Sequence, residues 1–545
     1  MTAAQPTIHS SSRLKHPIIL VVSTLIVFSP LLLADFCSLD DSLNIWQNPN
    51  LNPPTVASVA YYWSHEAYGL YIPVTYTIWA GLAMIARVSP DAFGVALNPM
   101  LFHGTNILVH IAGVLLAFKI LELLFNHRTA ACAGAMLFAL HPVQVEPVAW
   151  AAGLKDVLAG MWSLAAIYFF LLWSKGSLGW SGYLLGTIAL ILGMLSKPSA
   201  LVVPLVVFVI EVWLKDRPWR KTILCLTPWF ALSLACAVIG KISQPATGVP
   251  PAPIWARPLI VGDALAFYLY KLVLPINLAI DYGRRPAYVM GQSWFYFTWL
   301  VPTALAILLL RLWRRWRTGI AAGAVFVAAL FPTLGLVTFL FQYFSTTADH
   351  YLYLAMFGPA MVVASLIRWR TSLLKPALVV LPLWAVASFV QAQYWKDDIS
   401  LFQHNLNVNP NSLIALDNLA HAYDMRHQPY TSAEFLQKAV ELYPSDVNSQ
   451  QSLAGVLGEL GRTDESIAHR LQAIHLIEQR PSELRDYLAG THNIVGKDLQ
   501  KVGRLSEARD HFQAALKIKP DDSESRRNLT EVEEKMALPA TQSAR

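Results

Sequence analysis

Charged residues are scarce in this sequence of 545 amino acids, at 14% of the chain against about 25% in soluble proteins, whereas hydrophobic residues make up 55%. The four cysteines show no CxxC or Cys/His spacing, which argues against a structural zinc site or a disulfide framework. No soluble stretch carries a stripe of basic residues interleaved with aromatics, so the composition does not favour nucleic-acid binding. These deficits indicate an integral membrane protein.

The few charges are unevenly distributed along the chain. The residues from Lys396 onward hold 17 of the 41 Lys/Arg and 22 of the 35 Asp/Glu, which leaves 24 bases and 13 acids for residues 1–395. A basic, apolar body is therefore followed by an acidic, polar tail. In a membrane protein, an excess of bases is typical of loops that stay on the cytoplasmic side.

Eleven apolar runs approach the length of about 20 residues that crosses a bilayer. They cover 17–34, 104–125, 129–148, 156–173, 179–195, 199–214, 222–240, 295–310, 319–341, 351–367 and 376–392. The first run is longer than the apolar part of a signal peptide and precedes no Ala-x-Ala pattern, so we interpret it as a span. With the N-terminus inside, every dense basic cluster falls in a cytoplasmic turn and the tail lies outside.

Two further apolar runs, 71–86 and 259–279, contain proline or polar groups. We predict that they form interfacial or re-entrant helices on the outer side, the former within a first outer loop at 35–100. In this arrangement only Glu122, Glu211 and Asp216 of the 13 acids face the cytoplasm. Ionisable groups at span ends are costly and usually functional, so any chemistry is expected on the outer side.

The tail shows the 34-residue period of tetratricopeptide repeats, for example between Pro410 and Pro444. The pattern predicts three helix pairs and a polar capping helix over 396–536, with a disordered end at 537–545. Gly461-Arg462 and Gly503-Arg504 are expected to separate the two helices of the second and third pairs. Such an array binds extended peptides or partner proteins, although a simple spacer remains an alternative.

Several polar motifs lie at the predicted outer ends of the spans. The carboxylate pair Asp40-Asp41 follows the first span and is interpreted as a general base, a divalent-cation site or a solvated turn. A second set combines acids with bases that suit a phosphate: His141, Glu146, Lys155, Asp156, Lys197, Lys271, Arg284 and His350. Cations that hold a phosphate beside a carboxylate that takes a proton suit a lipid-phosphate substrate.

The order of these motifs resembles the membrane-embedded glycosyltransferases with tetratricopeptide tails, which belong to the GT-C superfamily and are related to protein O-mannosyltransferases. The matching segments are Asp40-Asp41, His141 to Glu146 with Trp150, Lys155-Asp156, Lys197-Pro198, Phe267 to Lys271, Asp349 to Tyr353 and Tyr394 to Asp397. There are two departures. The family usually has Glu-Arg-Lys-Asp where this chain has Gly153-Leu154-Lys155-Asp156 after Ala152, and it often has Arg in place of His350.

The resemblance implies an all-α, GT-C-like transmembrane domain at 1–395. It also implies inverting transfer of a hexose of the mannose type from a polyprenyl phosphate to a protein hydroxyl. Asp40 or Asp41 would be the base, and Glu146 would orient the sugar or share Mg or Mn with the two aspartates, if a metal is present. His141, Lys155, Asp156, Lys197, Lys271, Arg284 and His350 would bind the substrate. The expected location is a bacterial inner membrane, with the tail holding the acceptor protein in the periplasm.

Two other functions remain open at this point. An inactive GT-C-like body could serve as a scaffold whose tail recruits an envelope assembly. A transporter of lipid-linked sugars is the second alternative, but a transporter is expected to carry ionisable groups near the middle of its spans. The sequence places almost all such groups at the outer span ends.

Overall fold

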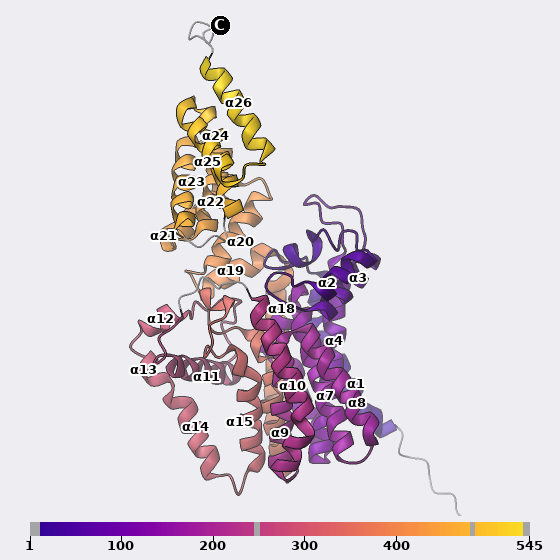
Figure 1. Ribbon diagram of the computed structural model, residues 1–545. Helices are drawn as coiled ribbons and strands as arrows, with labels where there is room; N and C mark the ends of the chain where they lie inside the picture. Colours follow the sequence, from indigo (N-terminus) through magenta and orange to yellow (C-terminus); the bar gives the residue numbers. More distant parts are fainter. Residues whose placement is uncertain (1–10, 245–250, 480–484, 538–545) are drawn as a thin grey trace, which may run out of the picture. The chain divides into compact units, whose positions relative to one another are not determined.

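The computed structural model describes residues 11–244, 251–479 and 485–537. Their regular structure is helical apart from three isolated β-bridges, and the chain forms two compact units, Met1–Pro410 and Asn411–Arg545 (Figure 1). The prediction of a disordered end at 537–545 falls, except for residue 537, outside the described residues. The all-α prediction is confirmed for the residues that the structure describes.

Six helical segments of the described chain are long and apolar enough to cross a membrane. They are Leu14–Leu33, Pro99–Phe125, Ala151–Ser174, Gly179–Ser196, Trp219–Ser243 and Thr371–Lys396. A seventh span results if Asp349–Ala355 and Phe357–Trp369, which are bent by 48° relative to each other, count as one. The remaining four predicted spans fall on shorter apolar helices: Arg128–Leu140, Pro198–Trp213, Phe295–Arg311 and Arg317–Thr333. The count of eleven spans therefore stays a prediction, whereas the polytopic helical body is confirmed.

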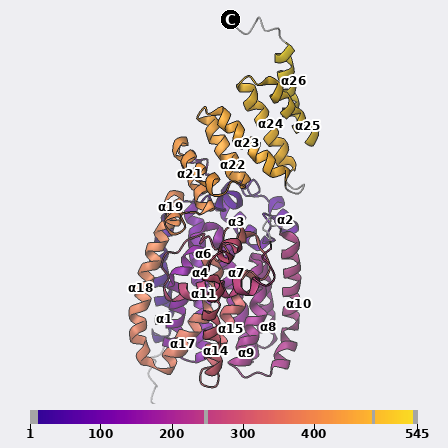
Figure 2. The same ribbon diagram turned by 90° about the vertical axis from the view of Figure 1, so that its left-hand side faces the viewer.

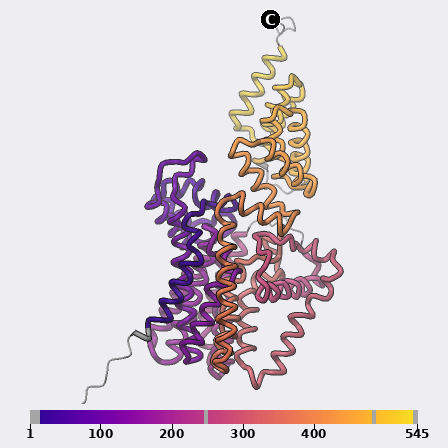
Figure 3. Tube along the Cα trace, turned by 180° about the vertical axis from the view of Figure 1, so that it is seen from behind, coloured from indigo at the N-terminus to yellow at the C-terminus, as the bar shows by residue number. Residues whose placement is uncertain are grey.

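The helices that frame the site and the basic turns belong to the first unit. They are α1 (Ser11–Phe28), α5 (Arg128–Leu140), α7 (Leu154–Ser174), α8 (Gly179–Ser196), α9 (Val203–Trp213), α10 (Trp219–Ser243), α14 (Leu300–Arg311), α15 (Arg317–Leu330), α17 (Phe357–Trp369) and α18 (Leu374–Gln393). Seen from behind, α1 and α18 run side by side although they come from opposite ends of the unit (Figure 3). The bundle is therefore closed by its first and last helices.

Small residues allow the helices of this bundle to approach closely. A Cβ atom on Gly134 of α5 would collide with the carbonyl oxygen of Ala360 in α17, and one on Gly160 of α7 would collide with the ring of Tyr353. Without a hydrophobic driving force between helices in lipid, such close packing supplies much of the association energy. The helix α7 is thereby held against the segment that follows Asp349.

The predicted external helices form at the expected places. Residues 71–86 contain α3 (Pro73–Ile85), and 259–279 contain α11 (Arg257–Val273). A further short helix, α2 (Val56–Ser64), lies in the first outer loop and begins with a capping box between Thr55 and Ser58. Figure 1 shows α11 lying across the direction of α10 and α15, as expected for a helix that does not span. The interfacial position of these helices stays a prediction.

The acids and bases of the predicted inner turns pair with one another. The three acids expected on the cytoplasmic side all pair with bases of the predicted inner turns: Glu122 with Arg128 at 2.8 Å, Glu211 with Lys215 at 3.1 Å, and Asp216 with Arg317 at 2.5 Å. The α9–α10 and α14–α15 turns lie at the same end of the unit (Figures 1 and 2). These two basic turns therefore share one end of the bundle, while the compartment that this end faces stays a prediction.

The second unit consists of antiparallel helix pairs. They are α20 (Leu413–Asp424) with α21 (Pro429–Leu442), α22 (Val447–Glu459) with α23 (Thr463–Glu478), and α24 (Arg485–Lys501) with α25 (Leu505–Ile518), followed by α26 (Ser523–Ala537) (Figure 2). Gly461 and Gly503 occupy the predicted turns with φ of 76° and 78°, a conformation that favours glycine. The tetratricopeptide architecture predicted for the tail is confirmed.

Candidate functional site

The turn after the first span gives the adjacent residues Asp40 and Asp41 different environments. Asp41 is fully buried, and its oxygens accept hydrogen bonds from the backbone nitrogens of Cys37 at 2.9 Å and Ala152 at 2.7 Å. It therefore ties the first outer loop to the segment that precedes α7. Burial raises the pKa of the Asp41 carboxyl to about 7. Because both oxygens are occupied by amides, Asp41 is placed to hold the turn together.

Asp40 points away from these amides and remains accessible. Its Oδ2 atom lies 3.2 Å from Nζ of Lys155 in the first turn of α7, and its side chain is 41% exposed. The ammonium of Lys155 lies 4.3 Å from the centre of the Trp150 ring. A cation between a carboxylate and an aromatic face is well fixed, and it can exchange the carboxylate for an incoming phosphate.

A second ion pair involves Asp156, the residue that follows Lys155. Nζ of Lys197, which follows the last residue of α8, lies 2.5 Å from Oδ1 of Asp156. The other oxygen of Asp156 is buried without a hydrogen-bond partner in the described structure. Burial lowers the pKa of the Lys197 ammonium, and the Asp156 carboxylate opposes that shift. A cavity of about 50 Å³ borders the pair and is also lined by Ser199 and Tyr351.

Glu146 is the fourth acid described in this region and is buried. Oε1 of Glu146 lies 2.6 Å from Nδ1 of His350, and its Oε2 accepts a hydrogen bond from the backbone nitrogen of Asp349 at 3.0 Å. Burial, with the nearby charge of Asp156, raises the pKa of Glu146 to about 8. A proton is therefore held on the Glu146 carboxyl at neutral pH.

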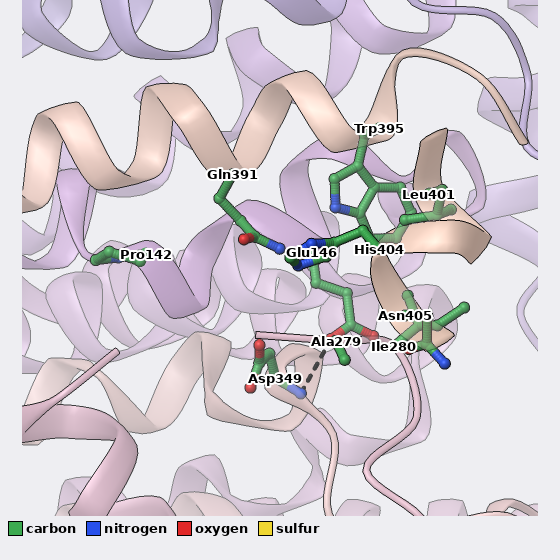
Figure 4. Close-up of a pocket in the computed structure, with 10 residues that line it drawn as sticks. All are labelled: Pro142, Glu146, Ala279, Ile280, Asp349, Gln391, Trp395, Leu401, His404 and Asn405. Carbon is green, nitrogen blue, oxygen red and sulfur yellow. Dashed lines mark hydrogen bonds between the residues drawn. The ribbon is translucent and has the colours of Figure 1, made fainter. Parts of the chain in front are cut away.

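A narrow cavity of about 10 Å³, room for one water molecule, borders Glu146 and Asp349. Figure 4 shows the Glu146 carboxylate pointing toward the backbone nitrogen of Asp349. The opposite wall comes from α18 and from α19 (Asp398–Val408), which contribute Gln391 and His404. The helix α19 thus packs on the membrane unit, although the sequence assigned residues from 396 onward to the tail.

Electrostatic interactions connect these pairs into one cluster. His350 interacts with Lys197, Asp156, Lys155 and Asp40, and Glu146 interacts with Asp156 and Lys197. The structure therefore brings together six of the ten residues that the sequence singled out. They come from the first outer loop, the short helix α6 (Val145–Ala149), the start of α7, the end of α8 and the segment before α17.

Lys271 and Arg284 lie beside this cluster and are engaged by neighbours, and Lys271 also interacts electrostatically with Asp349. Nζ of Lys271 donates to the carbonyl oxygens of Ile276 at 2.7 Å and Asn277 at 2.9 Å. The guanidinium of Arg284 binds both oxygens of Asp263, at 2.5 and 2.7 Å. Both cations therefore hold the 276–284 loop onto α11, and their contact with a phosphate stays a prediction.

His141 is likewise engaged by groups of the protein. Its Nε2 lies 3.2 Å from the carbonyl oxygen of Leu272, its Nδ1 accepts from the backbone nitrogen of Val143, and its ring packs on Trp384. Burial lowers the pKa of the imidazole to about 4, so the ring is neutral at physiological pH. A neutral ring with both nitrogens occupied caps the turn Pro142–Gln144 that follows α5 and offers no cation to a substrate.

Sequence reasoning missed two residues that complete the cluster. The hydroxyl of Tyr282 donates to the carboxylate of Asp349, 2.8 and 2.9 Å from its two oxygens. Asp349 belongs to one of the matching motifs, in which the sequence favoured its neighbour His350. Tyr282 carried no signal, because a tyrosine in a loop between two helices is ordinary until its partner is known.

The expectation that Asp40, Asp41 and Glu146 share a divalent cation finds no ready site. Among the described residues, no group of three or more His, Cys, Asp or Glu side chains is arranged to hold a metal ion. Both oxygens of Asp41 face backbone N–H groups, which are hydrogen-bond donors and not metal ligands. The residues present therefore do not fit a shared metal in this conformation.

No family model matches this chain. The chain is 23% identical over 494 residues to protein O-mannosyl-transferase TMTC3 of Mus musculus, which covers 78% of this chain and 52% of the relative. It is 20% identical over 502 residues to the TMTC3 protein of Homo sapiens, with the same shares of 78% and 52%. It is 23% identical over 438 residues to protein O-mannosyl-transferase F38B6.6 of Caenorhabditis elegans, which covers 74% of this chain and 59% of the relative.

The resemblance predicted from the sequence is therefore confirmed as a similarity over most of this chain. The chain spans about half the length of the curated relatives that it matches. A solved structure titled as the APC/C hetero-tetramer Cut9–Hcn1 aligns with 80% of this chain and 90% of its own at 13% identity, but its TM-score of 0.23 carries no argument. The comparisons support a multi-pass membrane protein related to glycosyltransferases that act on proteins.

Proposed function

We propose that this protein transfers a hexose of the mannose type from a polyprenyl phosphate to a protein hydroxyl. The observation that carries the proposal is the Asp40–Lys155 pair, which places an accessible carboxylate beside a cation at the end of the bundle opposite the basic turns. A base for the acceptor and a cation for the leaving phosphate are the two groups that this reaction needs. The similarity to protein O-mannosyl-transferases supports the same reaction class.

The donor phosphate is expected to bind between Lys155 and Lys197. Each ammonium already faces one carboxylate, Asp40 and Asp156, so the site is organised before the phosphate arrives. When the phosphate binds the Lys155 ammonium, the Asp40 carboxylate loses its counter-charge and becomes a stronger base. Donor binding therefore prepares the base for the acceptor.

Transfer then proceeds as one displacement with inversion. The acceptor hydroxyl oxygen forms a bond to the anomeric carbon while the bond from that carbon to the phosphate oxygen breaks. The hydroxyl proton passes to Asp40, and the polyprenyl phosphate leaves with the electron pair, stabilised by Lys155 and Lys197. No redox partner is required.

Glu146 has a positioning role in this scheme. Because it holds a proton and faces His350 and the amide of Asp349, it fixes the segment that carries His350 beside the cations. The location in a bacterial inner membrane and the capture of acceptor chains by the tetratricopeptide tail belong to the same proposal. Small residues at repeat spacing in the tail support a peptide-binding array.

The test uses the full chain in proteoliposomes with radiolabelled polyprenyl-phosphate mannose and envelope protein from a strain that lacks the gene. Label is expected to appear in protein with the parent, and to fall by a factor of about 10² or more with Asp40→Asn. Glu66→Gln, the same acid-to-amide change at an exposed position of the first outer loop, is the matched control and should retain the parental rate.

An unchanged rate with Asp40→Asn would refute the assignment of the base. If the parent transfers no label from polyprenyl-phosphate mannose or glucose, and deletion of the gene leaves every protein glycan in the cell unchanged, the scaffold function replaces the enzyme. Loss of an envelope assembly on the same deletion would then identify what the tail recruits.

A further inference from the structure

Two basic turns at the end of the bundle away from the site are held together by an ion pair. The guanidinium of Arg317, at the start of α15, binds both oxygens of Asp216 at 2.5 and 2.8 Å. Asp216 lies between α9 and α10, so this contact joins the residues 214–221 to the residues 311–317. We call these two segments the basic turn pair.

The basic turn pair carries more positive charge than its own acids neutralise. Lys215 and Arg217 share Glu211, and Arg317 is paired with Asp216. The structure shows no acidic partner within the described residues for the five other cations, all of them exposed: Arg220, Lys221, Arg311, Arg314 and Arg315. Five like charges on two joined turns repel one another and attract an anion.

Each of the two turns also presents an exposed tryptophan beside an arginine. The guanidinium of Arg220 lies 5.3 Å from the ring of Trp219, and that of Arg314 lies 5.3 Å from the ring of Trp313. The two indoles are 55% and 44% exposed. Tryptophan next to basic residues is typical of the level of lipid headgroups.

The helices that rise from these turns offer apolar surface with no protein cover. None of the 12 residues of α14 is buried, and Leu308 and Leu310 near its end are 53% and 58% exposed. On α10, Leu224 and Leu234 are 73% and 67% exposed. Acyl chains that extend from the headgroup level would lie along these two helices.

We propose that the basic turn pair binds the phosphate of an anionic phospholipid, whose acyl chains lie along α10 and α14. Charge decides the occupant, because five unpaired cations disfavour a zwitterionic headgroup, while the apolar helix faces disfavour a soluble anion. The site is distant in sequence from the proposed catalytic cluster, and the inference does not depend on sugar transfer.

The test is native mass spectrometry of the full chain with added phosphatidylglycerol or phosphatidylcholine at equal concentrations. The parent is expected to retain phosphatidylglycerol, and Arg314→Gln with Arg315→Gln should weaken that binding roughly tenfold without changing phosphatidylcholine binding. Arg368→Gln with Arg370→Gln alters another basic turn at the same end and serves as the local control. Lys517→Gln with Lys519→Gln in the tail controls for net charge.

Four results would overturn the proposal. The first is that the parent retains phosphatidylglycerol and phosphatidylcholine equally. The second is that Arg368→Gln with Arg370→Gln weakens phosphatidylglycerol binding as much as the test variant does, which would indicate diffuse attraction. A complex of two chains that excludes the phospholipid would make a second copy the occupant. Polyprenyl phosphate that displaces phosphatidylglycerol at equal concentration would make the carrier lipid the occupant. Thermal unfolding in phosphatidylcholine confirms that each variant is folded before its binding is compared.

Discussion

Nζ of Lys155 lies 3.2 Å from Oδ2 of Asp40, 115 positions earlier in the chain, while the very next residue, Asp41, turns both of its oxygens to backbone amides. The two adjacent acids therefore differ in what they support. Asp40 faces solvent and a cation, which suits chemistry, and Asp41 closes the turn that presents Asp40. Function and stability are expected to separate at these two positions.

Substitution of Asp40 should affect transfer more than folding. Because its side chain is 41% exposed and forms one ion pair, Asp40→Asn is expected to change the free energy of unfolding by less than about 1 kcal/mol. Sugar transfer should fall by about two orders of magnitude or more, with kcat reduced and the KM for the donor little changed. If Asp40→Asn lowers the melting temperature but leaves sugar transfer unchanged, this assignment is contradicted.

Asp41→Asn should have the opposite effect. An amide in place of the carboxylate turns an N–H group toward the backbone nitrogen of either Cys37 or Ala152, which leaves a buried donor without an acceptor. The expected cost is about 1–3 kcal/mol in the free energy of unfolding. Thermal unfolding in detergent measures it, and a melting temperature equal to that of the parent would show that the turn tolerates the change.

Loss of one partner of the buried pair Lys197 and Asp156 should lower the stability of the protein more than loss of both partners. Lys197→Met leaves the Asp156 carboxylate without a counter-charge, at a cost of about 3–5 kcal/mol. Lys197→Met combined with Asp156→Leu should cost less than Lys197→Met alone, while sugar transfer stays lost. The control is Lys535→Met, which breaks the exposed pair with Glu531 and should leave the free energy of unfolding unchanged within measurement.

A double variant that is less stable than Lys197→Met would count against the ion pair as the source of the effect. In that case the packing of the two side chains, and not their charge, would dominate the measured free energy of unfolding. Lys197→Arg separates the two explanations, because it keeps the charge and changes the shape.

The raised pKa of Glu146 makes stability depend on pH in a defined direction. Its pKa rises from about 4.5 in the unfolded chain to about 8 in the folded protein, so the folded protein binds more protons between these values. Stability is therefore fully present below pH 4.5 and is lost as the pH rises toward and through 8. Glu146→Gln mimics the protonated group, and its melting temperature should fall less than that of the parent between pH 5.5 and 8.5. If the melting temperatures of the two proteins change with pH in parallel, the raised pKa of Glu146 is contradicted.

Hydropathy and repeat spacing predicted the helices because both depend on local patterns. Each of the eleven apolar runs contains helix, although the run 319–341 leaves its helix after Thr333, and the glycines of the tail turns lie where the period placed them. The partners of the charged residues could not be predicted in the same way. Lys155 and Lys271 look alike in sequence, yet one meets a carboxylate and the other meets two carbonyl oxygens, because the partner depends on how distant segments approach.

The boundary between the membrane unit and the tail could not be predicted from local sequence patterns either. The helix α19 is amphipathic and follows the last span, so its sequence is compatible with either unit. In the structure His404 contacts the carbonyl oxygen of Leu278 at 2.9 Å, and Asn405 accepts a hydrogen bond from the backbone nitrogen of Asp281 at 3.1 Å. Both partners belong to the membrane unit. An amphipathic pattern predicts a buried face but does not identify what covers it.

Two glycines of one helix provide a paired test of the packing in the tail. A Cβ atom on Gly496 of α24 would lie 2.6 Å from the ring of Phe512, which is fully buried in α25, whereas nothing lies within 4 Å of a Cβ atom on Gly490. Gly496→Ala is expected to destabilise the unit by about 1–3 kcal/mol through overpacking. Gly490→Ala should stabilise it by about 0.5–1 kcal/mol, because alanine loses less backbone entropy on folding. Hydrogen exchange of peptides from α24 and α25 in the full chain measures both changes. Gly496→Ala combined with Phe512→Leu should recover part of the loss, and protection that changes equally in the two alanine variants would show that the Phe512 contact does not limit this interface.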